Sequence, residues 1–142
     1  EQKMNAELVN KFFGAMSSGD VDTALSVLHE DCVNTDTATG QVMTGLDENR
    51  ADMENWLSMF SDMKVEAINQ VESGNMVATE MKMSGVNTGD MHMPDGSKIP
   101  ATGKSVEMTG CQVSEFKDGK MIRATQYYNM MTMMAQLGLA PE

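Results

Sequence analysis

Apolar residues recur every three to four positions through the first sixty residues, and this spacing predicts helices. One helix is expected over about 4–18, a second over about 21–28 with Asp20 as its N-cap, and a third that begins at Asp47. A short strand is expected near 32–36, between the second and third helices. The buried face of the third helix is formed by Met53, Trp56, Leu57 and Phe60.

From about residue 63 the pattern changes to the alternation of apolar and polar residues that is typical of strands. Turn signals at 73–75 and 118–119 predict hairpins, and hence a meander of four antiparallel strands. The last two strands are expected over about 105–117 and 120–129. The segment 87–103 is rich in Gly and has no period, which predicts a long loop that serves as a lid or as a wall of a site.

A short last helix is expected from about Met130, with Gly138 closing it. The element order is therefore three helices, an antiparallel meander and one short helix, which predicts an α+β fold. A single domain over 1–142 fits the length, since no repeat or linker interrupts the chain. Helices on the concave side of a strongly twisted sheet would leave a cone with a hollow.

Acidic residues outnumber basic ones by 21 to 10, so the formal net charge is −11. This balance argues against binding to nucleic acid or to anionic membrane surfaces, because both require clustered Lys and Arg. No apolar run approaches the ~18 residues that a membrane helix needs, and no secretory signal is visible. Cys32 and Cys111 are interpreted as buried free thiols, from which a cytoplasmic location is inferred.

The chain contains 17 methionines but only four phenylalanines and one tryptophan. Methionine fills irregular space and suits adaptable apolar surfaces. Two interpretations remain open, namely an ordinary core of drifted composition and a soft lining for an apolar pocket. No metal site is expected, because Met91-His92-Met93 is the one string of copper-type ligands and such a string arises readily in a chain this rich in methionine.

Several short strings occur in a characteristic order along the chain. They are SGD at 18–20, HED at 29–31, PATGK at 100–104, FKDGK at 116–120, and YYN at 127–129 followed by QLG at 136–138. Together these strings resemble the SnoaL-like (polyketide cyclase-like) family of the NTF2-like superfamily. The resemblance implies a cone-shaped fold with an internal ligand cavity, and frequent homodimers.

The resemblance also implies acid/base cyclisation or isomerisation of an apolar, polyketide-like substrate, with no metal or organic cofactor. In the family's cyclases an Asp at the start of the last helix is the acid/base, and Asn129 occupies that position here. An amide cannot accept and return a proton near neutral pH, although it can orient a carbonyl by hydrogen bonding. Three functions therefore remain open: a cyclase or isomerase, a non-catalytic binder of an apolar small molecule, and an interaction domain.

A two-residue turn at 118–119 would fix the pairing of the last two strands, so that the numbers of facing residues sum to 237. One sheet face then carries Met108, Gln112, Phe116, Met121, Tyr127 and Asn129. Apolar bulk with a few hydrogen-bonding groups is typical of a small-molecule pocket, although satisfied polar groups of a core are the alternative. Trp56, Phe60 and Asn34 are expected to complete the pocket, with core packing or a turn as their other roles.

The opposite sheet face carries apolar residues as well, namely Val113, Ile122 and Tyr128. Because a sheet with two apolar faces needs a second cover, a homodimer through this outer face is predicted. If the protein does transfer protons, Glu115 and Asp36 are the first carboxylates to consider. An epoxide hydrolase would instead need an Asp-Arg-Asp set around a water, and Arg123 is the only arginine on the late strands.

Overall fold

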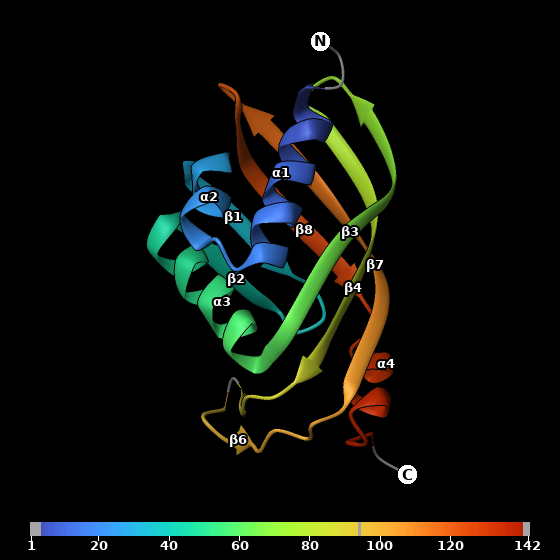
Figure 1. Ribbon diagram of the computed structural model, residues 1–142. Helices are drawn as coiled ribbons and strands as arrows, with labels where there is room; N and C mark the ends of the chain where they lie inside the picture. Colours follow the sequence, from blue (N-terminus) through green and yellow to red (C-terminus); the bar gives the residue numbers. More distant parts are fainter. Residues whose placement is uncertain (1–3, 94, 141–142) are drawn as a thin grey trace.

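The structure, a computed structural model, describes residues 4–93 and 95–140, in which three helices lie against the concave side of a curved sheet (Figure 1). The helices are α1 (Met4–Ser18), α2 (Val21–Val27), α3 (Gly45–Met59) and α4 (Met130–Gln136). The strands are β1 (Leu28–Asp36), β2 (Gln41–Thr44), β3 (Phe60–Ser73), β4 (Met76–Asn87), β5 (Met91–His92), β6 (Lys98–Ile99), β7 (Ser105–Lys117) and β8 (Lys120–Tyr128). The predicted α+β class and the concave position of α1–α3 are confirmed.

The main sheet has the strand order β2-β1-β8-β7-β4-β3. Its neighbours are antiparallel except β1 and β8, which run parallel. The predicted meander β3-β4-β7-β8 is present, and β1 and β2 extend it at the β8 edge. The parallel pair is possible because helix and meander separate its two strands in sequence. The strand β2 was not predicted, since four residues are too few to show a period.

The helix boundaries follow from local capping. Asp20 caps α2 as predicted, with its carboxylate accepting a hydrogen bond from the Thr23 N–H at 3.1 Å. The prediction that Asp47 caps α3 was wrong, because the N-cap is Thr44. The Glu48 carboxylate accepts a hydrogen bond from the Thr44 N–H at 2.8 Å and so satisfies a backbone donor at the start of α3. The helix therefore begins about one turn before the predicted start at Asp47.

The turn at 118–119 joins β7 and β8 as predicted, and both of its residues have positive φ angles, 55° at Asp118 and 77° at Gly119. Phe116 faces Met121, in agreement with the predicted register, but Glu115 faces Arg123. Ile122 is therefore an extra residue, a β-bulge in β8. Beyond it every side chain of β8 lies on the face opposite to the predicted one, since side chains alternate along a strand.

The long segment 87–103 lies at the end of the molecule opposite the N-terminus and contains the small β5–β6 hairpin (Figure 1). Its fixed point is Asn87, which is fully buried. The Asn87 amide nitrogen donates to the carbonyl oxygens of Met59 and Gly89, each at 3.0 Å, and its Oδ1 accepts from the Thr102 N–H at 2.8 Å. These bonds tie both ends of the segment to the end of α3.

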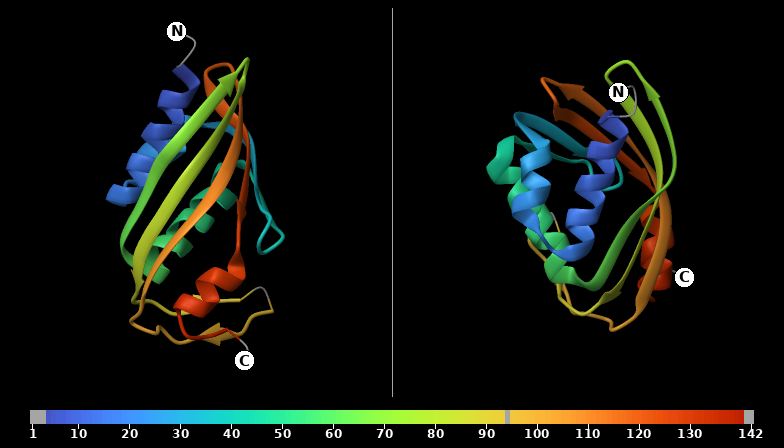
Figure 2. Two further views of the ribbon diagram at one scale, coloured as in Figure 1. Left: turned by 90° about the vertical axis from the view of Figure 1, so that its right-hand side faces the viewer. Right: turned by 45° about the horizontal axis from the view of Figure 1, so that its top comes forward.

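The short helix α4 does not share the concave side with the other helices but packs against the first residues of β7 (Figure 2). The Gln136 side chain joins the two, since its Oε1 accepts from the Glu107 N–H at 2.7 Å and its Nε2 donates to the Glu107 carbonyl at 2.8 Å. None of the described helices is long and apolar enough to span a membrane.

Two glycines offer a matched test of this register. A Cβ on Gly110 would lie 2.7 Å from the Tyr127 carbonyl oxygen and 3.2 Å from the Tyr128 Cβ, whereas one on Gly14 in α1 would have no neighbour within 4 Å. We predict that Gly110→Ala lowers the free energy of unfolding by about 1–3 kcal/mol, since the strands must separate. Gly14→Ala should raise it by about 0.5–1 kcal/mol, because alanine favours helix. Urea denaturation measures both, and an unchanged midpoint for Gly110→Ala would contradict the β7–β8 pairing.

Candidate active site

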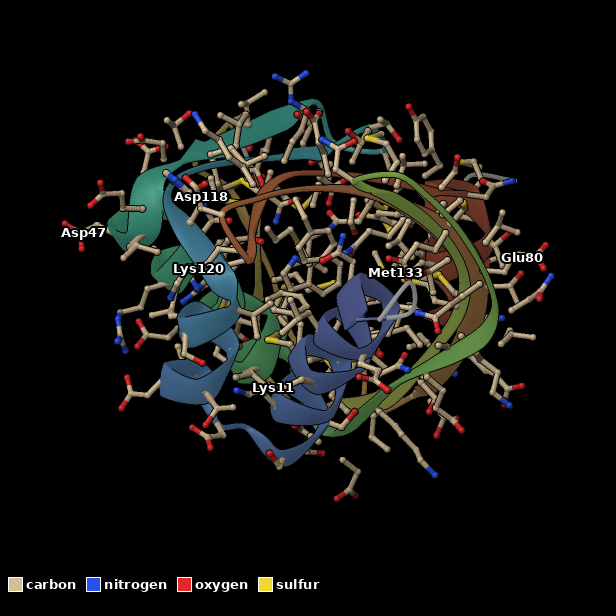
Figure 3. All side chains as sticks on the ribbon, turned by 90° about the horizontal axis from the view of Figure 1, so that it is seen from above. Lys11, Asp47, Glu80, Asp118, Lys120 and Met133 are labelled. Atoms are coloured by element: carbon tan, nitrogen blue, oxygen red, sulfur yellow. The ribbon has the colours of Figure 1, made fainter. Side chains whose placement is uncertain are left out.

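A cavity of about 130 Å³ lies between the helices and the concave face of the sheet. Its lining residues come from α1 and α3 on one side and from β1, β3, β4, β7 and β8 on the other. Figure 3 looks down on this arrangement, with α1 beside the curved sheet and side chains packed between them. None of the described residues of the segment, 87–93 and 95–103, lines this cavity, so the predicted role of the segment as a wall of the site was wrong. The reason is that Asn87 ties it to the far end of α3.

Aromatic rings form one part of the wall. Phe12 and Phe13 come from α1, Trp56 from α3 and Tyr128 from the end of β8. The Trp56 ring meets the Tyr128 ring edge-on with the centroids 6.4 Å apart, and it stacks on Phe60 at 5.9 Å. Trp56 thus lines the cavity as predicted. Phe60 does not, because it is buried behind Trp56 and supports it from the core.

Methionine forms most of the remaining wall. Five side chains from α1, β3, β4 and β7 contribute, namely Met16, Met63, Met81, Met83 and Met108. Other methionines are buried in the core away from the cavity, among them Met53, Met59, Met121 and Met133. Both interpretations of the methionine content therefore apply. The lining is soft and apolar wherever it is not aromatic.

Asp36, the last residue of β1, gives the cavity a fixed carboxylate. The residue is only 4% exposed. Its Oδ1 accepts hydrogen bonds from the backbone N–H groups of Ala38 at 3.0 Å and Thr39 at 3.1 Å. Its Oδ2 accepts from the Tyr128 hydroxyl at 2.8 Å. Asp36 therefore stabilises the turn after β1 and also holds Tyr128 in place across the parallel β1–β8 pair.

A second carboxylate, Asp52, reaches the cavity from α3. Burial raises the pKa of Asp52 to about 6, with a further contribution from the negative charge of Asp36, and no hydrogen bond from a described residue contributes to the shift. Burial also raises the pKa of Tyr128, and Asp36 adds to the effect through its charge and its hydrogen bond. Asp52 can therefore exchange a proton near neutral pH, while Tyr128 remains a hydroxyl donor.

The position of Asp52 depends on a buried amide one turn earlier in α3. Asn49 is 1% exposed. Its Nδ2 donates to the Gly45 carbonyl at 2.7 Å and lies 3.3 Å from the carbonyl oxygen of Cys32 in β1. The amide therefore ties α3 to the strand that carries Asp36, and so fixes the distance between the two carboxylate-bearing elements.

Two glutamines complete the polar part of the lining. Gln112 is 1% exposed and donates to the Ser114 hydroxyl at 3.0 Å, while its Oε1 accepts from the Gln126 Nε2 at 3.1 Å. Gln112 lies where the sequence predicted. The pairing predicted from the turn at 118–119 would place Gln126 on the opposite face, and the bulge at Ile122 brings it into the cavity instead.

Of the residues proposed from the sequence, Met108, Gln112 and Trp56 line the cavity. Phe116 faces inward as expected but is buried in the core without reaching the cavity. Asn34 is also buried and stays behind the cavity wall, two residues before Asp36 on the inward face of β1. Its Oδ1 has no hydrogen-bond partner among the described residues.

Tyr127 and Asn129 do not lie in the cavity, so their predicted placement was wrong. Tyr127 is 51% exposed because the bulge turns it to the outer face, and Tyr128 takes the inward position. Asn129 lies beyond the last residue of β8 and is exposed. Its side chain accepts from the N–H groups of Met131 and Thr132 as the N-cap of α4, so it satisfies a helix start.

Sequence reasoning missed Asp52 and Tyr128. A signal for Asp52 was available, because it lies four residues before Trp56 and next to Met53 on the apolar stripe of α3, where a carboxylate is out of place. No comparable signal existed for Tyr128, since a bulge leaves no mark in the alternation of β8. The bulge also turns Arg123 to the outer face, where its Nε lies 3.9 Å from a carboxylate oxygen of Glu115. Arg123 therefore does not reach the cavity, where an epoxide hydrolase site would need an arginine.

The raised pKa of Asp52 makes a test of its burial possible. Ionisation of Asp52 costs the folded state free energy above about pH 6, where the side chain is charged, and this cost fades as the pH falls towards the ordinary pKa of 3.8 and is absent well below it, where the side chain is neutral in both states. We predict that Asp52→Asn raises the free energy of unfolding at pH 7.5 by roughly 1–3 kcal/mol. The gain should fade as the pH falls from 6 to 4. Urea denaturation at pH 4 and 7.5 measures it.

The control for this comparison is Asp47→Asn, which removes an exposed carboxylate from the first turn of the same helix (Figure 3). It should give no such gain at pH 7.5. A stabilisation by Asp52→Asn that is equal at both pH values would show that the effect comes from packing and not from the buried charge.

Comparison with known proteins places the chain in a family. The family model for SnoaL-like polyketide cyclase matches residues 6–137. No curated protein matches the chain. A candidate SnoaL-like polyketide cyclase from Jannaschia sp. CCS1 has 17% identity and a TM-score of 0.83, with 99% of this chain and 95% of that chain covered.

Two further solved structures have the same fold. The wild-type IdmH of Streptomyces antibioticus, a candidate polyketide cyclase, has 25% identity and a TM-score of 0.76, with 94% of this chain and 98% of that chain covered. A hypothetical protein with a ketosteroid isomerase-like fold from Catenulispora acidiphila DSM 44928, in complex with trimethylamine, has 18% identity and a TM-score of 0.79, with 95% and 94% covered. Because the family model matches residues 6–137, and because the curved sheet with helices on its concave side is the NTF2-like fold, the chain belongs to the SnoaL-like polyketide cyclase family.

Proposed function

We propose that this protein is a cofactor-independent cyclase or isomerase that moves a proton on an apolar, polyketide-like small molecule held in the cavity. Asp52 is the acid/base, and the Asp36–Tyr128 pair sets its environment. The observation that carries the proposal is a carboxyl group in an apolar cavity with a pKa of about 6. General acid/base catalysis works best when the pKa of the catalytic group lies near the working pH.

The proposed chemistry begins with the ionised Asp52. Its carboxylate takes a proton from a carbon next to a substrate carbonyl, and the electron pair of the C–H bond moves into an enolate. In an isomerisation the protonated Asp52 returns that proton at another carbon of the enolate. In a cyclisation the enolate carbon attacks a second carbonyl, and Asp52 protonates the new alkoxide. In both cases Asp52 ends in its starting form, so no cofactor is consumed.

The polar neighbours have separate roles in this scheme. Asp36 raises the proton affinity of Asp52. Tyr128 donates to Asp36 and thereby keeps that carboxylate oriented. Gln126 gives one amide hydrogen to Gln112 and has a second one available for the substrate oxygen. The side chain of Gln126 therefore orients the reacting carbonyl, which is the role that the sequence assigned to Asn129.

The alternative function, a non-catalytic binder of an apolar small molecule, is less well supported. It depended on Asn129 replacing the acid of the family, yet the cavity contains two carboxylates of its own. The volume of about 130 Å³ is close to that of an engineered cavity of about 150 Å³ that binds benzene. One ring of a substrate therefore fits inside, and a larger polyketide-like body extends through the mouth.

Hydrogen–deuterium exchange tests the proton transfer without knowledge of the natural substrate. Small cyclic ketones such as cyclohexanone are incubated in D₂O, and exchange at the carbon next to the carbonyl is followed by NMR. The wild type should accelerate exchange, and Asp52→Asn should reduce the acceleration roughly 10²–10⁴-fold. The rate should rise as the pH passes about 6 and then level off, because the ionised carboxylate is the base.

Asp47→Asn, on the same helix but outside the cavity, should leave the exchange rate unchanged. If the Asp52→Asn variant accelerated the exchange as much as the wild type does, the assignment of Asp52 as the acid/base would be refuted. Acceleration that does not change between pH 5 and pH 8 would refute the proposed protonation state.

We also propose a homodimer through the convex face of the sheet, as the sequence suggested. Tyr128 does not belong to this face, but one row of small and apolar side chains crosses all six strands there. In spatial order it consists of Val42, Thr35, Thr125, Val113, Ala78 and Val71. Val42 and Val71, at the two edges, are 54% and 64% exposed. An exposed apolar row of this kind favours a partner surface.

Light scattering at micromolar concentration tests this assembly. The wild type should have the mass of a dimer, and Val113→Glu should have that of a monomer, since the charge would be buried at the centre of the interface. Glu80→Gln changes a charge on the same convex side and serves as the control (Figure 3). A monomeric wild type would refute the dimer.

A further inference from the structure

The cavity contains an uncompensated negative charge. Asp36 and Asp52 both line it, and the described lining residues include no lysine, arginine or histidine. The ion pairs found among the described residues lie elsewhere and involve neither carboxylate. The two acids therefore share one largely apolar cavity, and no cation among its described lining residues balances them. Such an arrangement disfavours anionic ligands and favours cationic ones.

This charge also bears on the chemistry proposed above. An enolate or alkoxide would form beside the carboxylate of Asp36, where negative charge is already present. No basic side chain of the described lining can neutralise the developing charge. The transition state would be stabilised if the substrate itself carried a positive charge close to the reacting carbonyl. The present inference rests on the proposed function in this respect, and it concerns the same cavity.

The walls are suited to an organic cation. The rings of Trp56 and Tyr128 stand at 76° to one another with centroids 6.4 Å apart, and both line the cavity with Phe12. Aromatic faces attract ammonium groups, and quaternary ammonium ligands are bound in cages of such rings. A divalent metal is a poorer match, because no group of three or more potential metal-binding side chains occurs within the described part of the chain.

We infer that the ligand of this cavity carries a cationic nitrogen, either a protonated amine or a quaternary ammonium, on a body of about one ring. The nitrogen lies between the carboxylates of Asp36 and Asp52 and against the ring faces of Trp56 and Tyr128. The remainder of the ligand contacts the methionine wall. Within the polyketide-like class proposed above, the substrate is thus a carbonyl compound that carries an amine on the ring held in the cavity.

Three probes of one shape and different charge test the inference. Choline is the cation, 3,3-dimethylbutan-1-ol is its neutral carbon analogue, and 3,3-dimethylbutanoate is the anion. Trp56 is the only tryptophan of the chain and lines the cavity, so its fluorescence reports binding directly. At constant ionic strength and pH 7.5, choline should bind at least about tenfold more tightly than the alcohol, and the anion should bind most weakly.

The charge of the cavity can be varied in two ways. Asp52→Asn should weaken choline binding about tenfold or more and leave binding of the alcohol within about twofold, whereas Asp47→Asn should change neither. In the wild type, choline affinity should rise as the pH passes about 6 and then level off, because Asp52 is ionised above that pH. Asp36 and Tyr128 are the other titratable groups that line the cavity, and Tyr128 stays neutral.

Equal affinity for choline and the alcohol would overturn the inference, and so would the absence of saturable choline binding. A choline affinity that is unchanged by Asp52→Asn and by pH would overturn it as well. The pH series uses the wild type alone, so the result does not depend on the folding of a variant. Exchange of cyclohexanone hydrogens without a preference for choline would refute the cationic ligand and leave the proposed proton transfer intact.

Discussion

The candidate site depends on one extra residue in one strand. Because side chains alternate along β8, the insertion of Ile122 exchanges the two faces for everything that follows it. Tyr128 and Gln126 point into the cavity for this reason, and Tyr127 points out. Without the bulge, the hydroxyl that meets Asp36 would lie on the other side of the sheet, and the polar end of the cavity would not form.

The other polar groups of the site are held in place by contacts that begin at Tyr128. Tyr128 binds Asp36, and Asp36 also holds the backbone of the turn after β1. The buried amide of Asn49 ties α3 to the same strand, so that Asp52 is carried to the Asp36 side of the cavity. The protonation of Asp52 is therefore set jointly by a bulge, a turn and a helix anchor that are far apart in sequence. A change at any of the three would alter the proton affinity without touching the carboxyl group itself.

Much of the fold could be predicted from the sequence, because its signals are local. The stripe of α1, the Asp20 cap and the turn at 118–119 each depend on a few neighbouring residues, and each is found where expected. The site could be predicted only in part. Met108 and Gln112 lie before the turn and keep their predicted face, whereas Tyr127 and Asn129 lie after the bulge and do not. An error of one residue in the predicted pairing is enough to exchange a side chain that lines the cavity for one that is exposed.

The methionine side chains that line the cavity come from α1, β3, β4 and β7, so the bulge in β8 does not affect their placement. This wall differs in flexibility from the polar end of the cavity. Methionine is unbranched and has three rotatable bonds, so the outline of this wall is set by side-chain torsions and not by the backbone. The opposite end is different, since Asp36, Tyr128 and Gln112 are each fixed by hydrogen bonds. The cavity thus combines a rigid polar end with a deformable apolar one. Such a cavity is selective for the polar group of a ligand and tolerant of the shape of its hydrocarbon part, without any change in the backbone. It therefore suits a set of compounds that share a reactive group and differ in their hydrocarbon frames.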